Sequence, residues 1–204
     1  MLFDYLIEKF GENEPIFFSD ISYENYSEIW LKKELSKLCE QGRIIRYERG
    51  IYYIPVKTPF GTSVLNPNKI IEKKYLANNG ARIGFYTGIT ALQQAGLSTQ
   101  MSNIPEIQTN NENSKLRRIT VGNQEVILRK SRVAIDNENI FVLQFLEMMN
   151  CISPDYFDDE RKSAIKEWIR KNNISQELVT KYAPYFPDKT MRNLIESGVI
   201  YYVA

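Results

Sequence analysis

The feature that most constrains this chain is an apolar helical stripe followed at once by a hairpin pattern. Leucines and a cysteine at helical spacing predict a helix that Ser27 caps and that ends at Gly42. The runs 44–47 and 51–54 are rich in β-branched and aromatic residues, and a turn around Gly50 separates them. We therefore expect one helix and a β-hairpin in direct succession.

Two further helices are expected before this unit. Apolar residues recur at helical spacing over 2–10, and Gly11 stands where that helix would end. Ser19 and Asp20 offer an N-cap for a short second helix through about Asn25. Three helices followed by a hairpin form the element order of a winged helix-turn-helix, a fold that places its third helix in the DNA major groove.

The remaining sequence predicts a domain of mixed helices and strands. A turn-rich connector at 58–63 marks the best boundary, so we expect domains over 1–57 and 58–204. Helices are expected at 66–76, 87–95, 140–150, 158–171, 176–183 and 188–197. Strands are expected at 82–86 and 104–109, in a hairpin of 116–121 and 124–130, and in a tail at 199–203. The expected fold class is α+β: an N-terminal winged helix-turn-helix followed by a larger mixed α/β domain.

Composition argues against several classes of protein. The 204 residues include no histidine and two cysteines, so a zinc site and a disulfide framework are not expected. The first residues do not resemble a signal peptide, and the apolar run 140–152 is too short to cross a bilayer. Neither a P-loop nor a hydrolase nucleophile elbow occurs. We expect a cytoplasmic, non-enzymatic protein without a cofactor or a metal.

The net charge of +1 hides a strong segregation of charge along the chain. Residues 1–28 carry one lysine and seven acidic residues, whereas residues 29–57 carry seven basic and three acidic residues. Residues 58–135 carry ten basic and four acidic residues, and 136–204 carry eight and eleven. This pattern predicts basic faces on two separate parts of the fold.

The first basic face belongs to the expected third helix and the hairpin. Candidate DNA-binding residues are Ser27, Trp30, Lys32, Lys33, Lys37, Arg43, Arg46 and Arg49. Three interleaved glutamates, Glu28, Glu34 and Glu48, would each repel phosphate. Two alternatives stay open: Trp30 could pack against the first helix, and the whole unit could serve as a protein-docking adaptor without DNA binding.

The second basic face lies around the expected hairpin of the larger domain. Its residues are Lys115, Arg117, Arg118, Arg129, Lys130 and Arg132, and Glu125 is the acidic residue that the sequence places against them. This patch could contact an acidic protein or a nucleic acid, or its charges could keep an exposed sheet edge from aggregating.

A carboxylate cluster between Asp155 and Glu160, with Lys162 nearby, has two interpretations. It could hold Mg²⁺ in a small nuclease. The favoured interpretation is that these acids begin the helix at 158–171, where they complement the positive end of its dipole.

Several segments together resemble the AbiEi-type antitoxins. The run 31–38, then Gly42-Arg43-Ile44 and Arg49-Gly50-Ile51-Tyr52, is similar to the recognition helix and wing of that family. Downstream, the segment 87–92 with Gly96-Leu97 is similar to an element of the family's second domain, and 104–109 matches the strand that follows it. The resemblance covers most of residues 20–135.

The resemblance implies a transcriptional regulator that is also the antitoxin of a type IV toxin–antitoxin system. Its winged helix would bind inverted repeats of double-stranded DNA in its own promoter, as a homodimer could, and would repress transcription. Its second domain would counter a nucleotidyltransferase-like toxin without forming a stable complex. No membrane partner is implied.

Overall fold

The computed structural model describes residues 1–23, 26–59, 61–100 and 102–203. These residues form an α+β protein, as the sequence predicted. The chain divides into two compact units, Met1–Ile70 and Ile71–Ala204. The expected boundary after residue 57 therefore lies inside the first unit.

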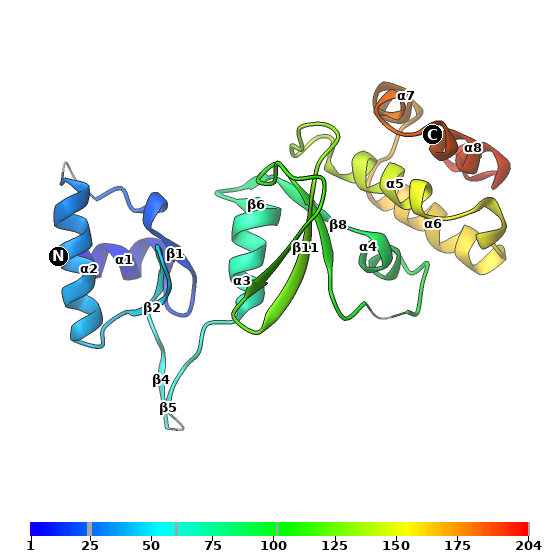
Figure 1. Ribbon diagram of the computed structural model, residues 1–204. Helices are drawn as coiled ribbons and strands as arrows, with labels where there is room; N and C mark the ends of the chain where they lie inside the picture. The colour runs from blue at the N-terminus through cyan, green and yellow to red at the C-terminus, as the bar shows by residue number, and fades with distance from the viewer. Residues whose placement is uncertain (24–25, 60, 101, 204) are drawn as a thin grey trace. The chain divides into compact units, whose positions relative to one another are not determined.

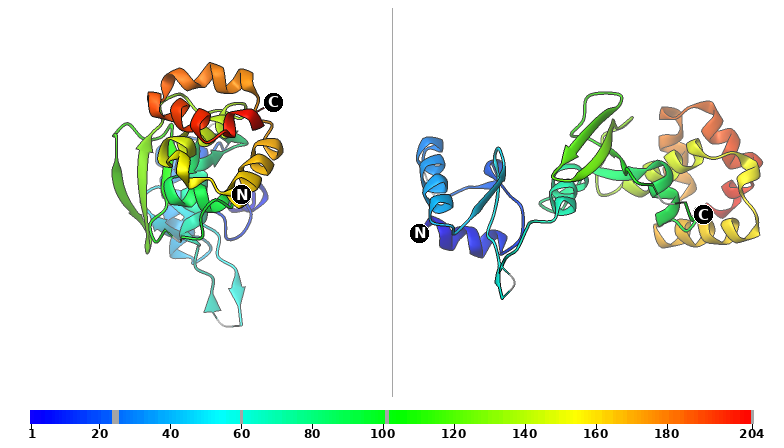
Figure 2. Two further views of the ribbon diagram at one scale, coloured as in Figure 1. Left: turned by 90° about the vertical axis from the view of Figure 1, so that its right-hand side faces the viewer. Right: turned by 60° about the horizontal axis from the view of Figure 1, so that its bottom comes forward.

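The first and third of the three helices expected before the hairpin form in the first unit. These are α1 (Leu2–Phe10) and α2 (Glu28–Glu40), which run at a steep angle to each other (Figure 1 and the right view of Figure 2). The Ser27 hydroxyl accepts the backbone N–H of Trp30 at 3.3 Å, so the predicted cap of α2 is confirmed. The leucines of both helices form one apolar core: Leu2, Leu6, Leu31, Leu35 and Leu38.

A three-stranded antiparallel sheet completes this core. Its strands are β1 (Ile16–Phe17), β2 (Ile45–Glu48) and β3 (Ile51–Tyr53), in the order β1-β3-β2. Gly50 has φ 80° in the turn between β2 and β3. The predicted hairpin is confirmed, because a left-handed turn residue of this kind is what a tight hairpin requires.

The prediction of a second helix is wrong for residues 19–23, the part of it that the structure describes. A single 3₁₀ turn, η1 (Phe18–Asp20), forms there, and 21–23 are not helical. Its expected end at Asn25 lies outside the described residues. The Lys9 ammonium donates to the carbonyl of Asp20, which ties this turn to α1 at 2.9 Å. The three-helix order of a winged helix-turn-helix therefore remains a prediction.

Residues 58–70 belong to the first unit, and hydrogen bonds and an ion pair join them to its N-terminal part. The connector forms a small hairpin of β4 (Lys57–Thr58) and β5 (Gly61–Thr62), and Phe60 lies outside the described residues. The Ser63 hydroxyl donates to the Asn13 side chain at 3.1 Å, and Lys69 pairs with Glu14. Leu65 is fully buried.

The second unit is built on a mixed four-stranded sheet. Its strands are β8 (Gly84–Thr87), β9 (Glu106–Thr109), β10 (Arg117–Val121) and β11 (Gln124–Lys130). In the order β10-β11-β9-β8, the central pair β11/β9 is parallel and the outer pairs are antiparallel. The expected hairpin around Gly122-Asn123 is confirmed.

Helices pack at one end of this sheet. They are α4 (Gly88–Gln94), α5 (Ile140–Cys151), α6 (Asp159–Lys171), α7 (Gln176–Tyr182) and α8 (Asp188–Glu196). Helix α5 lies at the centre and contacts α4, α7, α8 and β8 (Figure 1). Its apolar residues are therefore buried on nearly all sides. Short 3₁₀ turns, η3 (Pro154–Tyr156) and η4 (Ala183–Tyr185), separate the later helices.

Two other expectations need correction. The helix at 66–76 begins as α3 (Pro67–Ile71) but continues as a π-helical turn, η2 (Glu72–Leu76), followed by the short strands β6 (Ala77–Asn78) and β7 (Ala81–Arg82). The strand-like tail at 199–203 is instead a 3₁₀ helix, η5 (Val199–Tyr202). Val199 and Val203 are buried in the core that the helices of this unit form. The apolar residues of the tail therefore serve packing against helices and do not indicate a strand.

No helix within the described part of the chain is long and apolar enough to cross a membrane.

Candidate nucleic-acid interface

Helix α2 and the β2–β3 hairpin of the first unit enclose a basic hollow of about 490 Å³. Three of the candidate DNA-binding residues line it together: Lys32 from α2, and Arg46 and Arg49 from the hairpin. Lys32 precedes the hairpin in the sequence, and the fold brings it to the same face as the two arginines, as expected. Among the described residues, no carboxylate lines this hollow.

Four other residues line this hollow besides the candidate DNA-binding residues. Phe18 and Tyr52 supply aromatic surface, Ser36 supplies a hydroxyl, and Gly50 forms the turn. The strand register could have indicated Tyr52, because it pairs directly with Arg46 across β2 and β3. Lys32 also lies over the Phe18 ring, with its Nζ atom 5.3 Å from the ring centroid.

The lysines of α2 are exposed, and the ion pairs that they form are at the surface. The Nζ atom of Lys32 lies 3.0 Å from a carboxylate oxygen of Glu28, and that of Lys37 lies 3.9 Å from Glu34. Lys33 forms no ion pair with any described residue. Exposed pairs of this kind contribute about 0–1 kcal/mol, so an incoming phosphate could displace these carboxylates.

Trp30 does not extend freely from α2. Its ring is half-buried against the core of the first unit and stacks on Tyr26, with ring centroids 4.0 Å apart. Tyr23 stacks on it as well. These contacts favour the alternative that Trp30 packs against the core shared with the first helix, and a DNA contact by Trp30 stays a prediction.

The three arginines in and before the hairpin do not all lie at the same hollow. Arg43 is half-buried and its guanidinium lies over the Phe3 ring of α1, 3.7 Å from the centroid. It lines a different hollow, with Phe3 and Glu12. Arg46 and Arg49 are exposed. The structure thus assigns Arg43 to packing between α1 and the end of α2.

The second basic patch carries more acidic partners than the sequence indicated. Besides Glu125, which lies 4.0 Å from Arg118, three glutamates from other elements pair with its arginines. The closest N–O distances are 2.6 Å for Arg117–Glu112, 2.7 Å for Arg129–Glu106 and 2.8 Å for Arg132–Glu147. The expectation that Glu125 alone opposes the patch was wrong.

Glu112 is the most constrained of these partners. It is buried and accepts hydrogen bonds from the backbone N–H groups of Asn113 and Ser114 and from Arg117. Burial by itself would raise the pKa of this carboxyl group. The hydrogen bonds from Ser114, Arg117 and Asn113 outweigh burial and hold the pKa below 4.5. The patch is therefore largely neutralised from within the fold.

Lys115 and Lys130 form no ion pair within the described residues. They are neighbours, because the N–H of Lys130 donates to the carbonyl of Ser114. With Arg129 and Arg132 they line a hollow of about 340 Å³. The unpaired positive charge of the second patch is concentrated there.

A family model matches residues 7–177, which include α2, the β2–β3 hairpin and the whole four-stranded sheet. The chain belongs to DUF6088, a family of unknown function. A comparison with curated proteins finds no match.

Within the DUF6088 segment, Asp158, Asp159 and Glu160 begin α6, as favoured from the sequence, whereas Asp155 lies in the preceding 3₁₀ turn η3. Asp158 is the N-cap of α6: its side chain accepts the N–H of Arg161 at 2.9 Å and also pairs with the Arg161 guanidinium at 2.7 Å. Among the described residues, no group of three or more potential acidic or cysteine ligands is placed to hold a metal ion. The helix-start interpretation is confirmed for Asp158, Asp159 and Glu160 by their place at the N-terminus of α6.

Proposed function

We propose that this DUF6088 protein is a DNA-binding transcriptional regulator. The observation that carries the proposal is the hollow between α2 and the β2–β3 hairpin, where Lys32, Arg46 and Arg49 converge beside aromatic surface. Cationic side chains that converge on one face suit the phosphates of a duplex, and a short helix beside a hairpin suits a groove.

Helix and hairpin are held together as one surface, which favours a defined contact geometry. The N–H groups of Arg43 and Ile44 donate to the carbonyl of Leu38, so the chain leaves α2 in a fixed direction. Arg46 also lies close enough to Cys39 of α2 to offset part of the rise that burial causes in the thiol's pKa. A preorganised surface loses less conformational entropy on binding.

DNA binding is tested with the full chain and the DNA upstream of its own reading frame. Fluorescence anisotropy should give an affinity that falls steeply with salt and exceeds the affinity for unrelated DNA of equal length. The double variant Arg46→Ala/Arg49→Ala should weaken binding at least tenfold, whereas Arg43→Ala should have a smaller effect. No binding at low salt would favour the protein-docking adaptor instead.

We further propose, from the resemblance to AbiEi-type antitoxins, that the protein represses its own promoter and counters a nucleotidyltransferase-like toxin. The support is the ordered set of segments between residues 20 and 135 that resembles that family. Co-expression with the product of the neighbouring reading frame tests this role. The full chain should relieve growth inhibition by that product, and unrelieved inhibition would contradict the proposal.

A further inference from the structure

The unpaired positive charge of the second basic patch lies at a hollow that the proposed DNA contact does not use. This hollow, the β11 hollow, belongs to the unit Ile71–Ala204 and has a volume of about 340 Å³. Residues of β9 and β11 and of the loops beside these strands line it, and each lining residue is polar or basic. Among the described residues, no carboxylate lines it. Charge of one sign in a hollow favours an anion as the ligand.

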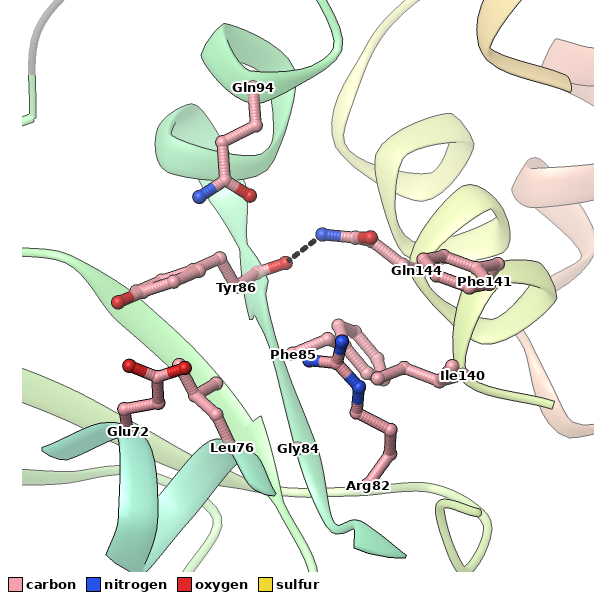
Figure 3. Close-up of a pocket in the computed structure, with 10 residues that line it drawn as sticks. All are labelled: Glu72, Leu76, Arg82, Gly84, Phe85, Tyr86, Gln94, Ile140, Phe141 and Gln144. Atoms are coloured by element: carbon pink, nitrogen blue, oxygen red, sulfur yellow. Dashed lines mark hydrogen bonds between the residues drawn. The ribbon is translucent and has the colours of Figure 1, made fainter. Parts of the chain in front are cut away.

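Another hollow of the same unit has a different lining. It lies between β8, the π-helical turn η2, α4 and α5, as Figure 3 shows. Its lining includes one acidic and one basic side chain, Glu72 and Arg82, together with apolar residues such as Phe85. Because these two charges have opposite signs, this hollow gives no net attraction for an anion.

The β11 hollow contains a buried glutamine whose side chain lacks a partner in the fold. Gln108 is 6% exposed, and its carboxamide forms no hydrogen bond with any described residue. In the hollow of Figure 3, by contrast, the Gln144 carboxamide donates to the backbone carbonyl of Tyr86 at 3.0 Å. A buried amide needs a hydrogen-bond partner, and an oxyanion in the β11 hollow would accept from the Nε2 atom of Gln108.

The sheet fixes the position of Gln108. Strand β9 lies between β8 and β11, and Gln108 pairs in register with Phe85 on one side and with Arg129 on the other. A Cβ atom at Gly84 would lie 2.7 Å from the carbonyl oxygen of Gln108, so only glycine allows β8 to approach β9 this closely. Register partners on neighbouring strands share a face of the sheet, and Gln108 and Arg129 both line the hollow.

Arg129 and Arg132 bring further donors to the β11 hollow. Each gives its Nε–H group to a glutamate: Arg129 donates to Glu106 at 2.7 Å, and Arg132 donates to Glu147 at 2.8 Å. A guanidinium group has five N–H donors, so both arginines keep donors for a ligand. The two glutamates balance the charges of the two arginines, which therefore add hydrogen bonds but little net charge.

Lys115 and Lys130 supply the charge that the fold leaves unbalanced. Neither forms an ion pair with any described residue. The N–H of Lys130 donates to the carbonyl of Ser114, the neighbour of Lys115, at 3.2 Å. Because the two backbones are this close, both ammonium groups can reach one ligand on their flexible stems. Together they carry two positive charges, which match the charge of a phosphate dianion.

We propose that the β11 hollow binds a phosphate dianion, either free or as the terminal group of a small phosphate monoester. Lys115 and Lys130 neutralise its two charges, while Gln108 and the two guanidinium groups donate to its oxygens. A nucleic-acid backbone carries one charge for each phosphate, so it suits this pair of lysines less well. The inference goes beyond the proposed function, because the site lies in the other unit and does not involve α2 or the β2–β3 hairpin.

Isothermal titration calorimetry on the full chain without DNA tests the ligand class. The probes are inorganic phosphate and glycerol 3-phosphate at equal ionic strength and about pH 8, where both are dianions. Dimethyl phosphate is the singly charged diester. At least one dianion should bind at submillimolar concentration, and the diester should bind at least tenfold more weakly. Tighter binding of inorganic phosphate would identify free phosphate as the ligand, and tighter binding of glycerol 3-phosphate would identify a monoester.

Variants test the assigned residues. Lys115→Met/Lys130→Met should weaken binding of the dianion at least tenfold. Lys162→Met/Lys171→Met removes the same charge from α6, outside the hollow, and should bind as wild type. Gln108→Met keeps the length of the side chain without its amide and should weaken binding at least threefold. Thermal unfolding without ligand shows that each variant is folded, and the lysine pair decides the test if Gln108→Met is not.

Three results would overturn the proposal. They are the absence of binding by both dianions at millimolar concentration, wild-type affinity of Lys115→Met/Lys130→Met, and a diester that binds as tightly as the dianions. Weakened DNA binding by the lysine variant in a chain that binds neither dianion would assign the hollow to a nucleic-acid backbone instead. Loss of the DNA contact at α2 and the hairpin would leave the phosphate titration unchanged, so the two failures are distinguishable.

Discussion

Ser27 was selected as a DNA contact, and in the structure its hydroxyl caps α2 by accepting the N–H of Trp30. A capping role and a DNA contact have different consequences on substitution. Ser27→Ala should lower the free energy of unfolding by about 0.5–2 kcal/mol, because an N–H group of the first turn loses its acceptor. Urea denaturation measures this change.

Ser27→Asp is the matched control for the cap. Aspartate also caps helices, so it should restore most of the lost stability, yet its charge would repel phosphate. If Ser27→Ala leaves the stability unchanged but weakens DNA binding, the result would contradict the capping role and support a direct DNA contact by Ser27.

Glu112 gives a prediction about pH. Its pKa is held below 4.5 in the folded protein, so the stability that its charge contributes is present above about pH 4.5 and is lost as the pH falls through the folded value. Glu112→Gln should destabilise the protein by about 1–3 kcal/mol at pH 7. The difference from wild type should shrink as the pH falls below 4.5 toward the lowered pKa of the folded protein.

Chemical denaturation of both proteins across this pH range measures the effect. A wild-type advantage that stays constant from pH 7 down to the pH at which the protein unfolds would show that the charge of Glu112 does not matter. It would leave shape or hydrogen bonding of the neutral group as the cause.

Among the helices and strands, the sequence predicted those features that depend on residues close together in the chain. The leucine stripe and the capping serine define α2, and Gly50 defines the hairpin turn, because each depends on neighbours within a few residues. The tail at 199–203 was mispredicted because its apolar residues pack into a helical core, which the local pattern does not distinguish from a strand.

The candidate sites were predicted less completely, because long-range contacts complete them. The sequence indicated Lys32, Arg46 and Arg49 but gave no means to separate them from Arg43, which packs on Phe3. In the second patch, Glu106 and Glu147 reach the arginines from other elements, so a count of charges along the hairpin missed them.

Gly84 allows a direct test of how β8 is positioned. Gly84→Ala introduces a Cβ atom that would overlap the carbonyl of Tyr75, and neither backbone can yield without displacing η2 or β9. Overpacking of this kind costs about 1–3 kcal/mol or more. Differential scanning calorimetry should show a lowered melting temperature, and wild-type stability would contradict the close approach.

At the scale of the whole chain, the boundary between the two units gives a prediction about fragments. Ser63, Leu65 and Lys69 complete the first unit through hydrogen bonds, burial and an ion pair. The fragment 1–70 should therefore be more stable than 1–57. Loss of Leu65 burial alone should cost about 1.5–3 kcal/mol.

Urea denaturation of the two fragments, followed by circular dichroism, measures this difference. Equal stability would contradict the assignment of residues 58–70 to the first unit and would favour a boundary after residue 57. Fragment 1–70 should also retain specific DNA binding, since it carries α2 and the β2–β3 hairpin.

The most direct test of the central claim is the salt dependence of DNA binding by the full chain. Lys32→Ala/Arg46→Ala/Arg49→Ala removes the three cations of the hollow, and Lys162→Ala/Arg170→Ala/Lys171→Ala removes three cations around α6 as a control. If the hollow contacts phosphates, the slope of log K against log salt should shrink by about 0.9 for each lost contact in the first variant. The control should keep the wild-type slope. Equal slopes for wild type and both variants would contradict the account.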